Sequence, residues 1–129
     1  MSENENPVNW FEIYVDDMER AKDFYSTVLN KELAQMDLPE GMDGDMKMVA
    51  FPMIPGAINS SGALVKSGEM KPGTGGTLIY FSCEDCAKEE SRVEGAGGKV
   101  LQPKYQIGEH GYCSICMDTE GNTFGLYSN

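Results

Sequence analysis

A chain of 129 residues is long enough for one domain and too short for two ordinary ones. Its 40% hydrophobic content is enough for a core, and its 24% charged content is normal for a folded domain, which excludes wholesale disorder. With 10 basic and 21 acidic residues the net charge is −11, which excludes a surface that neutralises nucleic-acid phosphates or docks on anionic lipid.

The first half begins with period-two alternation and continues at helical spacing. Residues 8–15 are predicted to form a strand, one face carrying Phe11, Ile13 and Val15 and the other carrying Trp10, Glu12 and Tyr14. Asp16 and Asp17 supply capping oxygens for a helix whose apolar stripe runs from Met18 to Leu29, and Asn30 is a plausible left-handed stop. Short strands are expected at about 33–36, 47–51 and 62–65.

The second half follows a segment with the composition of a linker, KSGEMKPGTGG. Residues 77–83 alternate as a second strong strand, and Glu84-Asp85 caps a second helix that runs to about Glu94. Three short strands are expected near 99–101, 112–117 and 123–127, with a turn at 118–122 between the last two.

Both halves therefore have the order strand, helix, strand, strand, strand. An offset of 68 residues aligns Glu12 with Tyr80 and Asp17 with Asp85. We predict a single α+β domain of two βαβββ modules, at about 8–66 and 77–129, joined by a linker at about 67–76. A curved mixed sheet around a shared cavity would bury the helix-facing sides of both modules.

Two runs of residues resemble the vicinal oxygen chelate superfamily, which includes glyoxalase I, bleomycin-resistance proteins and extradiol dioxygenases. The run VDDMERAKDFY at residues 15–25 is similar to the family's opening, and DTEGNTFGL at residues 118–126 is similar to its closing turn and strand, with Thr119 where proline is usual. The resemblance extends from about Val8 to Tyr127. It implies the glyoxalase/bleomycin-resistance fold and a small-molecule site, and its nearest likeness is to glyoxalase-like members without an assigned reaction.

The resemblance also implies where metal ligands would stand. In metal-dependent members they lie early in the first strand and in the last strand of each half, which correspond here to Trp10, Gly62, Leu78 and Gly125. None of these side chains can coordinate a divalent ion, which needs imidazole, carboxylate or thiolate ligands. We therefore expect neither a metal nor another cofactor.

The residues left in the predicted cavity suggest acid–base chemistry or ligand binding. Glu12 beside aromatic walls would be poorly solvated and thus a stronger base, able to take a proton next to a carbonyl while Tyr80 donates to the oxyanion. Alternatively, Glu12 bonds backbone groups or reaches water at an open rim. The remaining candidate ligand-binding residues are Trp10, Tyr14, Leu78, Ser82 and His110, the last on a loop before a strand.

The four cysteines form two CxxC pairs, Cys83/Cys86 and Cys113/Cys116, a spacing found in zinc sites. The second pair falls within a predicted strand, where a three-residue step spans about 10 Å and places the thiols on opposite faces. We interpret these cysteines as buried small hydrophobes, with a structural zinc protein as the alternative.

Three functions follow from these observations. The first is a metal-independent lyase or isomerase that uses Glu12 and Tyr80, the second is a non-catalytic protein that sequesters a small hydrophobic or aromatic compound, and the third is a structural zinc protein. No apolar run long enough to span a membrane and no secretory signal is found, so we expect a cytoplasmic protein with reduced thiols. By resemblance we expect a homodimer, with no nucleic-acid or membrane partner.

Overall fold

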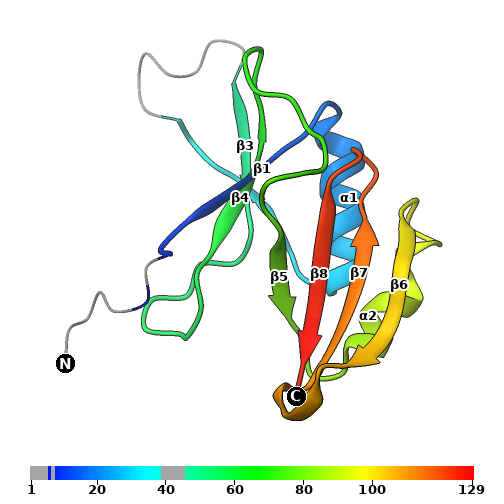
Figure 1. Ribbon diagram of the computed structural model, residues 1–129. Coiled ribbons are helices and arrows are strands. Elements are labelled where there is room, and N and C mark those ends of the chain that lie inside the picture. The colour runs from blue at the N-terminus through cyan, green and yellow to red at the C-terminus, as the bar shows by residue number, and fades with distance from the viewer. Residues whose placement is uncertain (1–5, 7, 39–45) are drawn as a thin grey trace.

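The computed structural model describes residue 6, residues 8–38 and residues 46–129 (Figure 1). The elements of the first half are β1 (Phe11–Tyr14), α1 (Met18–Leu29), β2 (Ala34–Gln35), β3 (Lys47–Ala50) and β4 (Gly62–Lys66). Those of the second half are β5 (Ile79–Ser82), α2 (Cys86–Val93), β6 (Lys99–Gln106), the 3₁₀ turn Gly108–His110, β7 (Tyr112–Met117) and β8 (Thr123–Ser128).

The strands form two four-stranded sheets with the same topology. One has the order β1-β4-β3-β2 and the other β5-β8-β7-β6. In each sheet the first and last strands of the module pair in parallel, and the other neighbours are antiparallel. The α+β fold of two βαβββ modules is thus confirmed. The strands divide between two four-stranded mixed sheets that do not close into a barrel.

Helix α1 forms as its sequence pattern predicts. The Oδ1 atom of Asp17 accepts a hydrogen bond from the backbone N–H of Arg20 at 3.0 Å, which caps the first turn. Asn30 ends the helix in the left-handed conformation, with φ of 53°. The predicted apolar stripe is buried in full, comprising Met18, Ala21, Phe24, Tyr25, Val28 and Leu29.

The second module differs more from expectation at its boundaries. Asp85 caps α2 by accepting from the N–H of Ala87 at 3.0 Å, as predicted. Strand β6 continues to Gln106, five residues beyond its predicted end, and passes through Pro103. A proline is tolerated there because β6 is an edge strand, so its missing N–H costs no ladder hydrogen bond. The two described helices, of 12 and 8 residues, are too short and too polar to cross a bilayer.

The core joins the two modules through aromatic rings on the helix-facing sides of both sheets. Helices α1 and α2 lie behind the second sheet in Figure 1, and α1 also packs on the first. Phe81 of β5 contacts Phe11 and Phe51 with ring centroids 5.9 and 5.5 Å apart. Phe24 of α1 contacts Phe124 of β8 at 5.8 Å. The modules therefore share one hydrophobic core.

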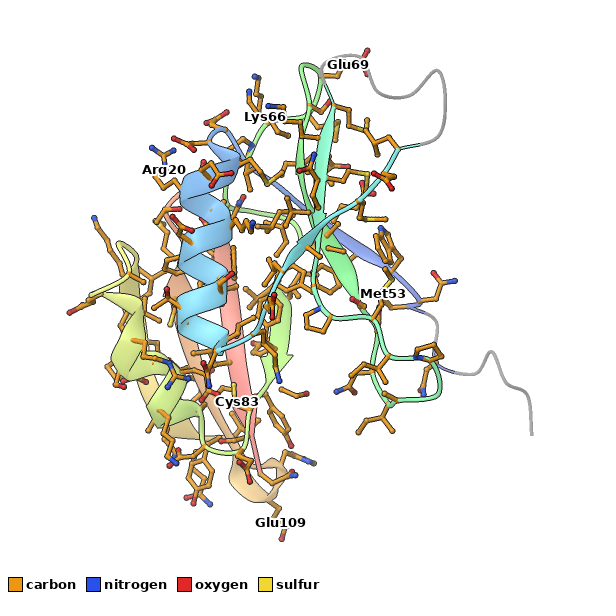
Figure 2. All side chains as sticks on the ribbon, turned by 180° about the vertical axis from the view of Figure 1, so that it is seen from behind. Arg20, Met53, Lys66, Glu69, Cys83 and Glu109 are labelled. Carbon is orange, nitrogen blue, oxygen red and sulfur yellow. The ribbon has the colours of Figure 1, made fainter. Side chains whose placement is uncertain are left out.

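A buried carboxylate also ties the start of α1 to the last turn of the chain. The side chain of Glu120 is fully buried and accepts hydrogen bonds from the backbone N–H groups of Asp16 and Asp17, both at 2.9 Å. Arg20, which Figure 2 shows near the start of α1, donates to it through Nε at 2.7 Å and Nη2 at 3.0 Å. We call this set of contacts the Glu120 clasp.

Burial opposes ionisation of Glu120, but hydrogen bonds from Arg20, Asp17, Thr119 and Asp16 outweigh it and lower its pKa to about 2. Next to the clasp, the hydroxyl of buried Tyr25 donates to Oδ2 of Asp118 at 2.6 Å. These contacts connect residues about 100 positions apart in the sequence and fix the position of α1 against the second module.

Candidate functional site

The face of the first sheet opposite α1 carries a second apolar cluster. Its buried members are Met48, Ala63 and Val65, and its partly buried members are Trp10, Tyr14, Met36, Leu38 and Met46. We call the members other than Trp10 and Tyr14 the methionine floor. The register explains it, because Glu12 pairs with Ala63 and Met48 pairs with Val65, so these side chains point to the face that α1 does not cover.

Glu12 lies on this face between the two aromatic residues of its own strand. Its Oε2 atom accepts a hydrogen bond from Trp10 Nε1 at 3.2 Å, and its Oε1 atom accepts one from the hydroxyl of Tyr14 at 2.9 Å. The predicted period-two grouping of Trp10, Glu12 and Tyr14 is confirmed. Glu12 is exposed, however, so this chain alone does not supply the poor solvation that a strong base requires.

The hydrogen bond to Glu12 raises the pKa of Tyr14, and partial burial and the negative charge of Glu12 add to the effect. Tyr14 therefore keeps its proton at neutral pH and acts as a donor to the carboxylate. Glu12 is held in one orientation by two donors, and no cation is paired with it among the described residues.

Tyr80 lies on the corresponding face of the second sheet. It pairs with Gly125, and its ring covers that glycine, where an added Cβ would lie 2.4 Å from the ring. Burial raises the pKa of Tyr80, and Cys113 and Tyr105 contribute further. Tyr80 is nevertheless 47% exposed. The residues that raise the pKa of Tyr80 thus lie on β6 and β7, whereas the hydrogen-bond donors to Glu12 lie on or directly before β1.

The other predicted ligand-binding residues are spread over the second module. Leu78 is 37% exposed just before β5, and Ser82 at the end of β5 accepts a hydrogen bond from Asn59 Nδ2 at 3.3 Å. His110 lies exposed in the 3₁₀ turn, where its backbone carbonyl accepts from the hydroxyl of Tyr127. Within the described part of one chain, no hydrogen bond or ion pair joins Glu12 to any of these residues or to Tyr80.

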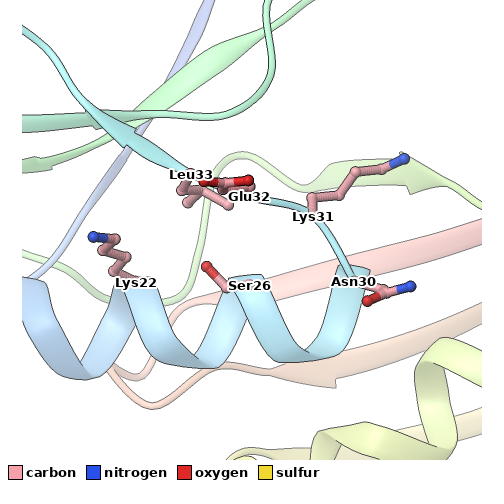
Figure 3. A pocket seen from close by; sticks show the side chains of 6 residues that line it. All are labelled: Lys22, Ser26, Asn30, Lys31, Glu32 and Leu33. Atoms are coloured by element: carbon pink, nitrogen blue, oxygen red, sulfur yellow. The ribbon is translucent and has the colours of Figure 1, made fainter.

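Two hollows of the described surface lie beside α1, and the second of them also reaches Met48 of the methionine floor. One, of about 600 Å³, is shown in Figure 3, where Lys22 and Ser26 project from α1 and Leu33 follows the helix. The other, of about 380 Å³, is bordered by Lys22, Lys47 and Lys66 and by acidic residues at the start of α1. Neither is bordered by a residue predicted for the site.

The donor set on the open faces does not fit the family's metal. The sequence spacing assigned Gly62 to the last strand of the first half, but Gly62 pairs with Phe11 on the helix-facing side, and Ala63 is the residue opposite Glu12. The assignment was wrong by one residue. Ala63 and Gly125 occupy the same position in the last strands of the two halves, an offset of 62 residues, whereas the sequence spacing had matched Gly62 with Gly125. The corresponding residues of the two halves, Ala63 and Gly125, have no donor atom, so we derive no chemistry through a metal ion.

Cys83 precedes α2, Cys86 is its first residue, and Cys113 and Cys116 lie on β7, where Cys113 is close enough to Tyr80 to raise the pKa of that tyrosine. Cys113 and Cys116 point to opposite faces of β7, as predicted, since they pair with Tyr127 and Phe124 respectively. Burial raises the pKa of Cys83 to about 12, and the carboxylate of Glu89 adds to the effect, so this thiol is a poor metal ligand. Over the described residues, no three His, Cys, Asp or Glu side chains are grouped so as to hold a metal ion.

Sequence reasoning did not single out the methionine floor. Lys47–Ala50 and Gly62–Lys66 are buried on both faces for most of their length, so their residues show no alternation that separates one face from the other. The local richness in methionine was the available signal.

Two βαβββ modules of identical strand order, each with a helix on one face and an open second face, define a paired-module α+β protein. Residues 8–126 match the model of the Glyoxalase/Bleomycin resistance protein/Dioxygenase superfamily, and the chain belongs to that superfamily. The resemblance noted in the sequence is thereby confirmed.

Curated and solved relatives agree with this membership. The chain is 26% identical over 127 residues to "Putative glyoxylase CFP32" of Mycobacterium tuberculosis, covering 92% of this chain and 44% of that protein, so it spans less than half of that relative's length. TnmS3, an antibiotic binding protein from Streptomyces sp. CB03234, is 27% identical with a TM-score of 0.66, covering 94% and 93% of the two chains. Glyoxalase I from Zea mays shares the fold, with a TM-score of 0.72, 21% identity, and coverage of 93% and 43%.

Proposed function

We propose that this protein binds and sequesters a small aromatic compound on the open face of its first sheet. The observation that carries the proposal is the placement of Trp10, Glu12 and Tyr14 over the methionine floor, which combines accessible apolar surface with one oriented polar group. Ligand sites are commonly built in this way, from apolar walls and a few fixed polar groups.

The composition of the floor suits an aromatic ligand of adaptable shape. Methionine side chains are flexible and polarisable, so Met36, Met46 and Met48 can adjust to a planar molecule that stacks beside Trp10. The likeness to TnmS3, described as an antibiotic binding protein, extends over almost the whole of both chains and supports binding without turnover.

The alternative function is a metal-independent lyase or isomerase that uses Glu12 as base and Tyr80 as donor. It requires both side chains at one substrate. In one chain Glu12 is exposed and each of its oxygens already accepts a hydrogen bond, and Tyr80 contacts a different set of residues. These contacts favour binding over catalysis.

A homodimer is the assembly we propose for the binding protein. Leu78 and Tyr80 of the second module are exposed, and the loop between β3 and β4 carries Ile54 and Ile58, which are 70% and 88% exposed. A second copy of the chain would cover such surface and could bring Tyr80 towards Glu12. Sedimentation velocity measures the assembly directly, and a monomer at all concentrations would contradict it.

The binding function is tested with the fluorescence of Trp10, the only tryptophan. A panel of polycyclic aromatic antibiotics is titrated into the protein, and we expect at least one to change the emission of Trp10 saturably and to raise the melting temperature. After incubation the compound is recovered and analysed by mass spectrometry. Recovery unchanged is the expected result. Conversion that Glu12→Gln abolishes would support the lyase or isomerase instead, and no response to any compound would contradict the proposal.

A further inference from the structure

The carboxylate of Glu12 has bonding capacity that the described chain does not use. An ionised carboxylate offers about four lone-pair positions, and Trp10 and Tyr14 occupy one on each oxygen. The three ion pairs of the described residues involve Glu120, Glu89 and Asp85, so Glu12 is left as an oriented anion without a partner. It stands next to the methionine floor, which offers no hydrogen-bond donor of its own.

From this geometry, and resting on the proposed function, we propose that the ligand is a cation: a planar aromatic body that carries a protonated amine or amidine, with the charged nitrogen on Glu12 and the rings on the methionine floor. A cationic N–H donor can take the free lone pair of each oxygen and form charge-assisted hydrogen bonds. An anionic ligand would be repelled by the same carboxylate.

The two aromatic neighbours place apolar surface beside the carboxylate. Trp10 and Tyr14 flank Glu12 on the same strand face, so the aromatic body of a cation held by Glu12 would pack against their rings. Because Tyr14 keeps its proton, it adds no second negative charge and remains a donor that holds Glu12 in place. The apolar body of the ligand would contact Met36, Leu38 and Met46, the partly buried members of the floor, because Met48 and Val65 beneath them are buried.

The experiment compares two probes with the same ring system. 9-Aminoacridine is protonated at about pH 8 and acridine is neutral there, so the pair differs in charge while the aromatic body is kept. Their dissociation constants are measured by calorimetry and by the emission of Trp10. We expect 9-aminoacridine to bind about tenfold more tightly, in line with the contribution of a hydrogen bond to a charged group.

The matched variants separate a local effect from the attraction of a net charge of −11. Glu12→Gln keeps the shape and should remove the tenfold preference while leaving acridine within about twofold of the wild-type value. Glu19→Gln removes the same charge from the exposed first turn of α1, on the other side of the sheet, and should keep the preference. Tyr14→Phe removes one donor and should give an intermediate value.

Each outcome decides between the two proposals. Equal affinity for both probes, with no effect of Glu12→Gln, would overturn the cation inference and leave the binding function standing. Equal loss in the Glu12 and Glu19 variants would overturn it as well, because the effect would then be that of overall charge. Absence of binding for both probes, in protein whose unfolding midpoint is normal, would overturn the inference and count against the binding function for this ring size.

Discussion

The Glu120 clasp provides the sharpest stability prediction. Glu120→Gln keeps the shape of the side chain but removes its charge, and its amide nitrogen would face the donors of Arg20. The pKa of Glu120 is about 2 against a usual 4.5. Since each tenfold change in an ionisation constant corresponds to about 1.4 kcal/mol, the whole difference corresponds to about 3 kcal/mol. Arg20 is half exposed and solvent screens its part, so we expect a loss of about 2 kcal/mol at pH 7.

The sign of the pH dependence follows from the lowered pKa. The folded state holds the charged form of Glu120 more strongly than the unfolded state does, so the stabilisation is full above about pH 5 and disappears as the pH falls towards 2. Urea unfolding followed by circular dichroism, in a series from pH 7 to about pH 2.5, measures this for the wild type and the variant. The two curves should converge in acid.

Asp23→Asn is the matched control, because it removes a carboxylate from an exposed position of the same helix and from no described hydrogen bond. It should change the free energy of unfolding by less than about 0.5 kcal/mol. If Glu120→Gln is equally mild at pH 7, or if its deficit persists unchanged in acid, the reasoning from the clasp is refuted.

Three further predictions concern the core and its thiols. Tyr25→Phe removes the hydroxyl that donates to Asp118 at 2.6 Å, and it should lower the free energy of unfolding by about 1–3 kcal/mol in urea titrations; an unchanged midpoint would contradict this. Gly98→Ala would place a methyl group 2.4 Å from a backbone carbonyl oxygen and should cost about 2 kcal/mol, whereas Gly95→Ala, whose nearest neighbour is 4.0 Å away, should cost far less by the same assay. Cys83, with its pKa raised to about 12, should be alkylated by iodoacetamide at pH 7.5 much more slowly in the native protein than in urea, and rapid native labelling would argue against its burial.

Local patterns predicted the elements well because local forces form them. Capping by Asp17 and Asp85, the left-handed Asn30 and the apolar stripe of α1 depend on neighbouring residues, and all four are found where the sequence placed them. The grouping of Glu12 with its aromatic neighbours follows from the period of a strand, and it too is confirmed. Boundaries were less accurate, and β6 was the largest miss, because Pro103 indicates a break unless the strand is known to lie at an edge.

What the sequence could not predict depends on how the two modules pack. The division of the strands into two sheets depends on tertiary packing. So does the separation of Glu12 from Tyr80, because period-two alternation shows which residues share one face of a strand but not what that face packs against. The role of Glu120 was missed for the same reason. It stands in a turn that looks ordinary locally, and its partners lie about 100 residues earlier.

The clasp also bears on how the polypeptide is made. Translation proceeds from the N-terminus, so α1 leaves the ribosome long before Asp118 and Glu120 are synthesised. Until they emerge, the backbone amides that precede α1 lack the carboxylate of Glu120, and the hydroxyl of Tyr25 lacks Asp118 as its acceptor. The nascent first module therefore lacks these contacts until synthesis is nearly complete. A stop codon that removes only the last dozen residues would leave α1 without its contacts to Asp118 and Glu120.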